Sequence, residues 1–200
     1  MARRSLALVD YDAGNLTSVR KGFAAAGADL FTPASPDELA GAAAIVVPGV
    51  GHFAATGALG GPWRRAIAAA LALGTPLLGI CLGLQWLFDG SDEAPDAAGL
   101  GALPGRCTRL PPGLKVPHVG WNSIEVIRAS RLLDGVESGA QVYFTHSYAA
   151  PVTQACVAST THGATFASVV ERDNVFGVQF HPEKSGEAGI RILCNFVSLT

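Results

Sequence analysis

Charged residues are scarce in this sequence, and the few present are nearly balanced in sign. Asp, Glu, Lys and Arg make up 15% of the 200 residues, against about 25% in typical soluble domains, and the formal net charge is −2. The basic residues are scattered, with no run longer than the pairs Arg3-Arg4 and Arg64-Arg65. Because a nucleic-acid backbone is bound by clustered positive charge, we expect no nucleic-acid partner.

Closely spaced cysteines are absent as well. The chain has four cysteines, Cys81, Cys107, Cys156 and Cys194, and the nearest two of these are Cys81 and Cys107. A structural zinc site usually needs cysteines only a few residues apart, and disulfide frameworks are typical of small secreted domains. We therefore expect neither a metal site nor disulfides, and we interpret all but one of these cysteines as small buried apolar residues.

The sequence also lacks an unbroken membrane span. Residues 66–88 carry no charge, but Gly74-Thr75-Pro76 interrupts them, which is typical of a helix end followed by a turn. The apolar run Leu6–Val9, which follows a basic start, is too short for the ~7–15 residue core of a signal peptide. These features predict a protein with no membrane contact and a cytoplasmic location.

Strands and helices are expected to alternate through the first ninety or so residues. Ser35–Glu38 has the pattern of a helix-capping box with proline at the first helical position. Four apolar runs predict strands and two further segments predict helices: Leu6–Asp10, Asp29–Thr32, Ala43–Val47 and Leu77–Ile80, then Leu16–Ala26 and Pro62–Leu73. This order predicts a single α/β domain over residues 1–200, with a largely parallel sheet covered by helices on both faces.

The second half of the chain is less regular. From Ala94 to about Val136, Gly and Pro are frequent and the predicted strands, around Cys107, Val116 and Ile124, are short. A closing helix is predicted after four more strands, namely Val142–Thr145, Cys156–Ser159, Ala167–Glu171, Val175–Phe180 and then the helix Glu187–Val197. The three residues between the last two strands indicate a hairpin, so the sheet should be mixed.

A candidate nucleophile lies between a predicted strand and a predicted helix. Gly79-Ile80-Cys81-Leu82-Gly83 has the context of a nucleophile elbow, with sulfur in place of the serine oxygen. Glycines tolerate the tight backbone of such a turn, and the helix N-terminus behind it favours a thiolate. On these five residues alone, a glycine-rich turn that packs a structural cysteine fits equally well.

A candidate base follows the last predicted strand. Among the five histidines, only His181 combines a strand end with a carboxylate two residues away, at Glu183. A carboxylate at that distance can bond one imidazole nitrogen, which fixes the tautomer and stabilises the imidazolium. With the elbow already present, this arrangement favours a Cys81–His181–Glu183 triad over a structural histidine.

The loop Pro48–Phe53 supplies a third element. Glycines at a strand end leave backbone N–H groups free for an anion, so Gly49, Val50, Gly51 and the N–H of Leu82 are candidate oxyanion donors. The loop lacks the GxxxxGK[ST] pattern of a nucleotide-binding P-loop. No cofactor is predicted.

Together these motifs resemble the class I, or triad, glutamine amidotransferases, whose glutaminase domain is flavodoxin-like. The resemblance implies that Cys81 attacks the side-chain amide of L-glutamine, that His181 acts as base and then acid, and that Glu183 supports it. It also implies a glutamine pocket lined by Gln85, Glu93, His146, Ser147 and Tyr148.

Within that class the chain is similar to the glutaminase subunits of imidazole glycerol phosphate synthase, an enzyme of histidine biosynthesis. The similarity lies in Asp10–Leu16, Pro48–Phe53, Lys115–Asn122, Tyr143–Tyr148 and Gly177–Ser185. It implies a heterodimer with a separate (β/α)8-barrel cyclase subunit, which receives the ammonia. By the same resemblance the residues facing that partner are Asn15, Pro117, His118, Gly120, Trp121, Asn122 and Lys184.

Because 200 residues leave no room for a domain that uses ammonia, we expect the glutaminase to be slow alone, with its oxyanion N–H groups turned away until the partner binds. Three alternatives stay open. The chain could be the glutaminase subunit of pyridoxal phosphate synthase, although that loop resembles PGGES and this one is PGVGHF. It could also be a non-enzymatic flavodoxin-like binding module, or a Cys–His hydrolase without a partner.

Overall fold

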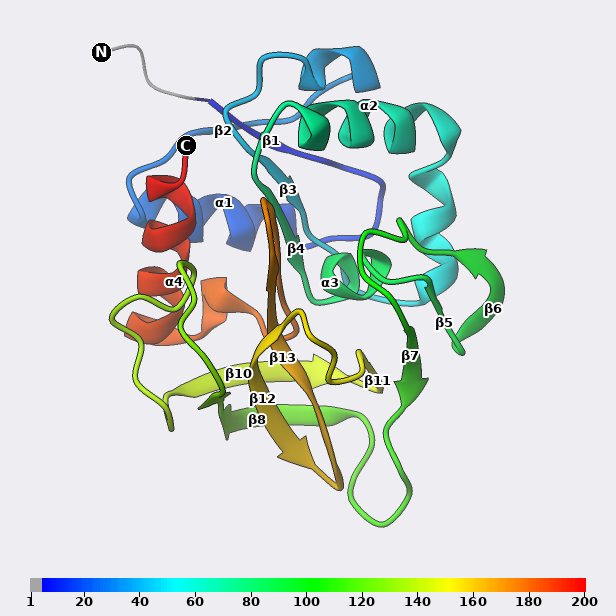
Figure 1. Cartoon of the computed structure of the whole chain (residues 1–200), viewed down its shortest axis with the longest axis vertical. Helices are drawn as coiled ribbons and strands as arrows, with labels where there is room; N and C mark the ends of the chain where they lie inside the picture. The colour runs from blue at the N-terminus through cyan, green and yellow to red at the C-terminus, as the bar shows by residue number, and fades with distance from the viewer. Residues whose placement is uncertain (1–4) are drawn as a thin grey trace.

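The centre of the molecule is an eight-stranded mixed sheet, seen in a computed structural model that describes residues 5–200 (Figure 1). The strand order is β2-β1-β3-β4-β14-β13-β12-β9. The first five strands run parallel, and the other three continue the sheet in antiparallel pairs. Their bounds are β1 Leu6–Leu8, β2 Leu30–Phe31, β3 Ile45–Val47, β4 Leu77–Ile80, β9 Glu125–Val126, β12 Cys156–His162, β13 Ala164–Arg172 and β14 Val175–Val178. The mixed sheet predicted from the sequence is confirmed, while the basic pair Arg3-Arg4 lies outside the described residues.

Helices cover both faces of this sheet, because successive residues of a strand point to opposite sides. On one face Leu6 and Leu8 of β1 belong to the same core as Phe23 and Phe196, which lie on α1 (Leu16–Ala25) and α4 (Gly186–Ser198). On the other face the core includes Ala7 with residues of α2 (Gly61–Ala72) and α3 (Leu82–Trp86). The predicted arrangement of helices on both faces is therefore confirmed.

The N-termini of α1 and η1 show how far local sequence determines helix capping. Helix α1 begins after Asn15, whose side-chain Oδ1 accepts a hydrogen bond from the Ser18 N–H at 3.3 Å. The capping box predicted at Ser35–Glu38 is wrong in part, since Ser35 makes no side-chain cap bond and only the short 3-10 helix η1 (Pro36–Leu39) follows. The Glu38 carboxylate does reach back, and accepts from the Ala34 N–H at 3.0 Å. One turn of helix is too short to need the full box.

Two smaller sheets form in the region where the sequence predicted only short strands. Strands β8 (His118–Ser123) and β10 (Gln141–His146) pair antiparallel and lie across the lower end of the molecule in Figure 1. A four-stranded sheet in the order β11-β7-β5-β6 lies beside them. Its bounds are β5 Gly90–Ser91, β6 Ala94–Ala98, β7 Arg106–Arg109 and β11 Tyr148–Ala149, and the short 3-10 helices η2 and η3 span Phe53–Ala58 and Pro182–Lys184.

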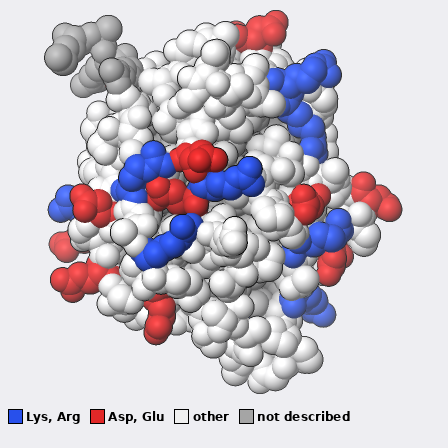
Figure 2. All heavy atoms as spheres, in the orientation of Figure 1, with Lys and Arg blue, Asp and Glu red and all other residues white. Residues whose placement is uncertain are grey.

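The surface and the cysteines agree with the composition. On the face shown in Figure 2, positive and negative side chains lie interspersed between broad uncharged areas. All four cysteines are free thiols. Cys107 and Cys156 are buried as predicted, and so is Cys81, but the prediction is wrong for Cys194, which is only partly buried. In the part of the chain that the structure describes, no helix is long and apolar enough to cross a membrane.

Candidate active site

Cys81 lies at a strained turn between β4 and α3. Its backbone φ is +54°, in the left-handed region that side chains other than glycine rarely adopt. A Cβ on Gly79 would lie 2.6 Å from the Gly83 carbonyl oxygen, and a Cβ on Gly83 would collide with the Val47 carbonyl. Both glycines are therefore required by close backbone approach, as expected of a nucleophile elbow.

His181 and Glu183 form a buried pair at the end of β14. The His181 Nδ1 lies 2.8 Å from the Glu183 Oε1, and these side chains are 3% and 2% exposed. Burial alone lowers the pKa of His181, but its interactions with Cys81 and Glu183 outweigh this and raise it to about 10. Both interactions therefore favour the protonated form of the imidazole. The second Glu183 oxygen is buried without a hydrogen-bond partner in the described residues.

Since Nδ1 is engaged by Glu183, Nε2 is the nitrogen of His181 that remains for Cys81. Nε2 is buried and has no hydrogen-bond partner of ordinary geometry among residues 5–200, yet Cys81 is the first of the groups that raise the pKa of His181. Such contacts are often long before substrate binds. The two side chains, a hundred residues apart in sequence, therefore meet at one end of the sheet.

Cys81 opens into a small cavity of about 160 Å³. Gln85 projects there from α3, and Glu93 is held by the Phe53 N–H, which donates to its Oε2 at 2.8 Å. The walls contain most of the residues predicted for the pocket, with Pro117 and Thr145 in addition; the predicted ones are Val50, Gly51, Leu82, Gln85, Glu93, His146, Ser147 and Tyr148. The structure thus brings these side chains and backbone groups around one thiol.

Two of the four candidate oxyanion donors are hydrogen-bonded within the protein in this structure. The Leu82 N–H donates to the Gly49 carbonyl at 3.3 Å, and the Val50 N–H donates to the Ala13 carbonyl at 2.9 Å. Gly51 has a φ of +102°, which a side chain would disfavour. Two of the four predicted donors therefore point away from any substrate oxygen, and the loop has to turn before they can bind one.

The residues predicted to face a partner divide between surface and interior. Asn15, Pro117, Trp121 and Lys184 are exposed, and Gly120 and Asn122 are half-buried. The expectation for His118 is corrected, because this residue is 4% exposed. The cause is the alternation of side chains along β8, which turns His118 inward.

An aromatic surface cluster lies on the outer side of β8 and β10. Trp121 is 57% exposed and its ring lies 6.1 Å, edge to face, from that of Tyr143. The Lys184 Nζ lies 6.0 Å from the same tyrosine ring, and Val119 is exposed beside Trp121. Sequence reasoning named Lys184 and the segment Pro117–Asn122, which contains Val119 and Trp121, but missed Tyr143, whose place depends on the pairing of β8 with β10.

Three residues near the thiol were also missed. Thr145 contributes a carbonyl 3.9 Å from the Cys81 sulfur, and Gln179 contributes an amide nitrogen at 3.7 Å. Tyr11 has a buried hydroxyl without a hydrogen-bond partner in the described chain, next to Gly49. Burial and the nearby Cys81 raise the pKa of this phenol. The position of Gln179 two residues before His181 was the one available sequence signal.

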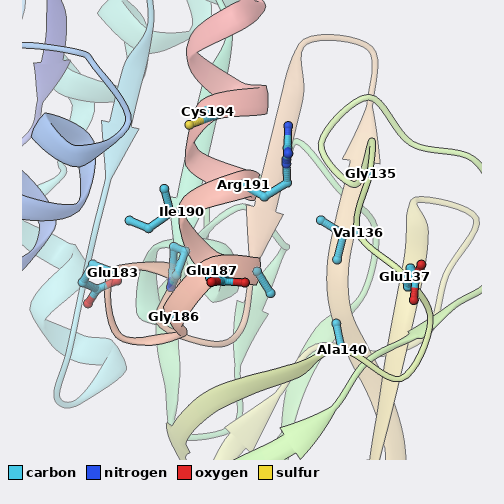
Figure 3. Close-up of a pocket in the computed structure, with 12 residues that line it drawn as sticks. Gly135, Val136, Glu137, Ala140, Glu183, Gly186, Glu187, Ile190, Arg191 and Cys194 are labelled. Atoms are coloured by element: carbon cyan, nitrogen blue, oxygen red, sulfur yellow. The ribbon is translucent and has the colours of Figure 1, made fainter.

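A larger hollow of about 880 Å³ lies elsewhere, between α4 and residues 135–140 (Figure 3). Its walls carry Glu137, Glu187 and Arg191, and it shares only Glu183 with the triad. Cys81 does not line it, so we place the chemistry in the smaller cavity. Nowhere in residues 5–200 do three His, Cys, Asp or Glu side chains gather in a way that could hold a metal ion.

Comparison with known proteins gives a consistent result. The family model described as glutamine amidotransferase class-I matches residues 7–199. Imidazole glycerol phosphate synthase subunit HisH of Natronomonas pharaonis is 49% identical over 95% of this chain and 92% of its own length. The same subunit of Methanothermobacter thermautotrophicus is 45% identical, covering 97% and 98%. The structure of PurLQS from Thermotoga maritima matches with a TM-score of 0.79 at 19% identity over 98% of both chains, which is a likeness of fold.

Proposed function

This chain belongs to the class-I glutamine amidotransferase family, and we propose that Cys81, His181 and Glu183 are the triad through which it releases ammonia from L-glutamine. It is a glutaminase, and its relatives indicate the glutaminase subunit of imidazole glycerol phosphate synthase. The observation that carries the triad is the buried His181–Glu183 pair beside a cysteine at a strained elbow. The relatives' names favour histidine biosynthesis over the pyridoxal phosphate alternative.

In the first half of the reaction Cys81 attacks. His181 takes the proton of the Cys81 thiol as base, and the sulfur adds to the carbon of the substrate's side-chain amide. The electron pair of the C=O bond moves to the oxygen. When the tetrahedral species collapses, the C–N bond breaks, His181 gives its proton to the departing nitrogen, and ammonia leaves a γ-glutamyl thioester on Cys81.

In the second half water replaces ammonia. His181, now neutral, takes a proton from water as the water oxygen attacks the thioester carbon. The carbon–sulfur bond breaks, the thiolate returns, and glutamate leaves. Glu183 stays hydrogen-bonded to Nδ1 throughout, so it keeps Nε2 directed toward the sulfur and stabilises the imidazolium.

Both tetrahedral species need an oxyanion site, and this requirement links the chain to a partner. Since the Leu82 and Val50 N–H groups are bonded to the Gly49 and Ala13 carbonyls, the resting loop withholds two of the four predicted donors from the oxyanion. We propose that the cyclase subunit, loaded with its phosphoribosyl-formimino carboxamide substrate, turns the Gly49–Gly51 loop. Removing one oxyanion donor typically costs about 10²–10³ in kcat, so the resting chain should be slow by about this factor.

We propose the aromatic cluster of β8 and β10 as the surface on which the cyclase docks. Trp121 and Val119 are large apolar residues that are more than half exposed, and exposed aromatics of this kind are enriched at interfaces. Lys184 follows the triad residue Glu183 directly. Contact there would thus lie close to the triad.

The experiment is an assay of glutamate release from L-glutamine, with the chain alone and with the ligand-loaded cyclase. We expect stimulation by about 10²-fold or more, and no glutamate in either condition from Cys81→Ser, which changes one atom and leaves the fold intact. Equal rates with and without the cyclase would reject the resting-loop proposal. Glutamate release by Cys81→Ser at the normal rate would reject the triad.

A further inference from the structure

A buried amide contacts the sulfur of the elbow. Gln179 is 0% exposed and lies between β14 and His181. Its side-chain Nε2 lies 3.7 Å from the Cys81 Sγ, and its backbone N–H is bonded to the Ser168 carbonyl at 2.9 Å. Burying a glutamine amide without hydrogen bonds destabilises the fold by several kcal/mol. The hydrogen-bond partners of the Gln179 amide therefore indicate its role.

The orientation of the Gln179 amide is fixed by its neighbour. The Gln85 Nε2 lies 2.8 Å from the Tyr148 carbonyl oxygen, and because a carbonyl only accepts, nitrogen must occupy this position. The same nitrogen lies 3.3 Å from the Gln179 Oε1. A flipped Gln179 would place two donors against each other, so its NH₂ group must lie on the side of the sulfur.

The Tyr148 carbonyl is held in turn by a chain of histidines. The His146 Nδ1 lies 2.9 Å from this oxygen, so Nδ1 carries the proton and Nε2 accepts. The His118 Nδ1 lies 3.2 Å from the His146 Nε2 and must donate, which leaves the His118 Nε2 to accept from the Asn122 Nδ2 at 3.3 Å. Every hydrogen bond in this series is therefore donated in the same direction, from Asn122 on β8 to the Tyr148 carbonyl that also accepts from Gln85.

We propose that Gln179 is a further catalytic residue, which donates a hydrogen bond to the Cys81 sulfur and stabilises its thiolate form. Its role in glutamine hydrolysis rests on the function proposed above. Hydrogen bonds to an ionised acceptor are about twice as strong as neutral ones, so the contact strengthens when the thiol loses its proton. The thiol state has the Thr145 carbonyl as acceptor, 3.9 Å from the sulfur.

The contact acts twice in the reaction. It raises the thiolate fraction before attack. It acts again when water has added to the thioester: the carbon–sulfur bond breaks, the electron pair goes to sulfur, and the Gln179 N–H meets the returning negative charge. His181 holds the proton taken from water in that step, so Gln179 gives up no proton and only its hydrogen bond strengthens and weakens.

The test replaces Gln179 with methionine, which has a similar shape and no donor. Alkylation of Cys81 by iodoacetamide, followed by mass spectrometry of its peptide, measures the thiolate directly and needs no turnover. We expect alkylation of Gln179→Met to be about tenfold slower than wild type at pH 7, with the difference narrowing as pH rises. Gln154→Met, an exposed glutamine, is the matched control and should equal wild type.

Equal rates in Gln179→Met and wild type would overturn the proposal, as would slowing by the same factor at every pH, which is the mark of a structural effect. Should Gln179→Met not fold, nuclear magnetic resonance of side-chain amides in the otherwise unchanged chain decides the matter. Cys81→Ala should then shift the Gln179 amide protons and leave those of Gln154 in place, and unmoved Gln179 protons would refute the contact. Absence of glutamate release from wild type with its cyclase would reject the proposed function without affecting either result.

Discussion

His181 is a single residue whose charge depends on two neighbours of different kinds. Glu183 binds Nδ1 at 2.8 Å and can only orient and stabilise the ring, whereas in the proposed mechanism Nε2 exchanges the proton with Cys81 and substrate. Orienting a base contributes less to the rate than being the base. Removing His181 should therefore lower the rate of glutamine hydrolysis more than removing Glu183.

We predict that His181→Ala lowers kcat for glutamine hydrolysis by about 10⁵-fold or more, and Glu183→Ala by about 10²–10⁴-fold. The measurement is glutamate release in the presence of the ligand-loaded cyclase. Circular dichroism of both variants serves as the control for folding. Near-normal turnover of His181→Ala, or a greater loss in Glu183→Ala, would contradict this assignment of roles.

At this scale the sequence predicted the triad because each part has a local signature. Cys81 lies between glycines after an apolar run, and Glu183 lies two residues from His181. Thr145 and Tyr11 have no such signature, and Gln179 has only its position two residues before His181, because their contacts with Cys81 depend on how distant strands are placed. The buried position of His118 was missed for a similar reason, since only the register of β8 with β10 decides which side chains point inward.

The strand–elbow–helix unit of β4, Cys81 and α3 depends on close backbone contact. The backbone of Gly83 packs directly against the Val47 carbonyl of β3, and Gly79 packs against Gly83. A methyl group at position 83 cannot be accommodated by a side-chain rotation, since the atom it meets belongs to the backbone of a central strand. The whole unit would have to move away from the sheet.

We predict that Gly83→Ala destabilises the chain by about 3 kcal/mol or more, in the range of severe overpacking. Gly57→Ala is the matched control, since a Cβ there would meet nothing within 4 Å and its φ is not positive; it should change stability by less than about 1 kcal/mol. Urea denaturation of both variants gives the comparison. Similar midpoints would show that the elbow can relax.

Elements of the parallel sheet were predictable to within a few residues, because buried parallel strands are continuous apolar runs such as Leu77–Ile80. The two smaller sheets were not. Strands such as β5 and β11 have two residues each, too few to show a period, and β11 pairs with β7, about forty residues earlier in the sequence. The capping box at Ser35 is the opposite kind of error. The local pattern there is clear, but only the single 3-10 turn of η1 follows it.

The whole molecule carries buried histidines whose pKa values move in opposite directions. His181 is raised to about 10, while burial lowers the pKa of His118 to about 4 and that of His146 to about 3. A histidine whose pKa is raised by folding stabilises the fold at pH values below its unfolded-state pKa of about 6.5. It loses that contribution as the pH rises toward its folded-state pKa, about 10 for His181. Histidines whose pKa is lowered by folding stabilise the fold above pH 6.5. They lose that contribution as the pH falls toward about 4 for His118 and about 3 for His146.

We predict a free energy of unfolding that is highest near pH 6.5 and declines on both sides, by roughly 1 kcal/mol per pH unit on the alkaline side. Urea denaturation followed by tryptophan fluorescence at pH 5, 6.5 and 8.5 measures it. Glu183→Gln should flatten the alkaline limb and His118→Phe the acid limb, with exposed His52→Gln as control. Stability that increases steadily up to pH 8.5 would refute the prediction.

The bond between the Leu82 N–H and the Gly49 carbonyl has a consequence for the cell. On the resting-loop proposal, a copy of this chain without its cyclase hydrolyses L-glutamine only slowly. An excess of this chain over the cyclase would therefore waste little nutrient and leak little ammonium.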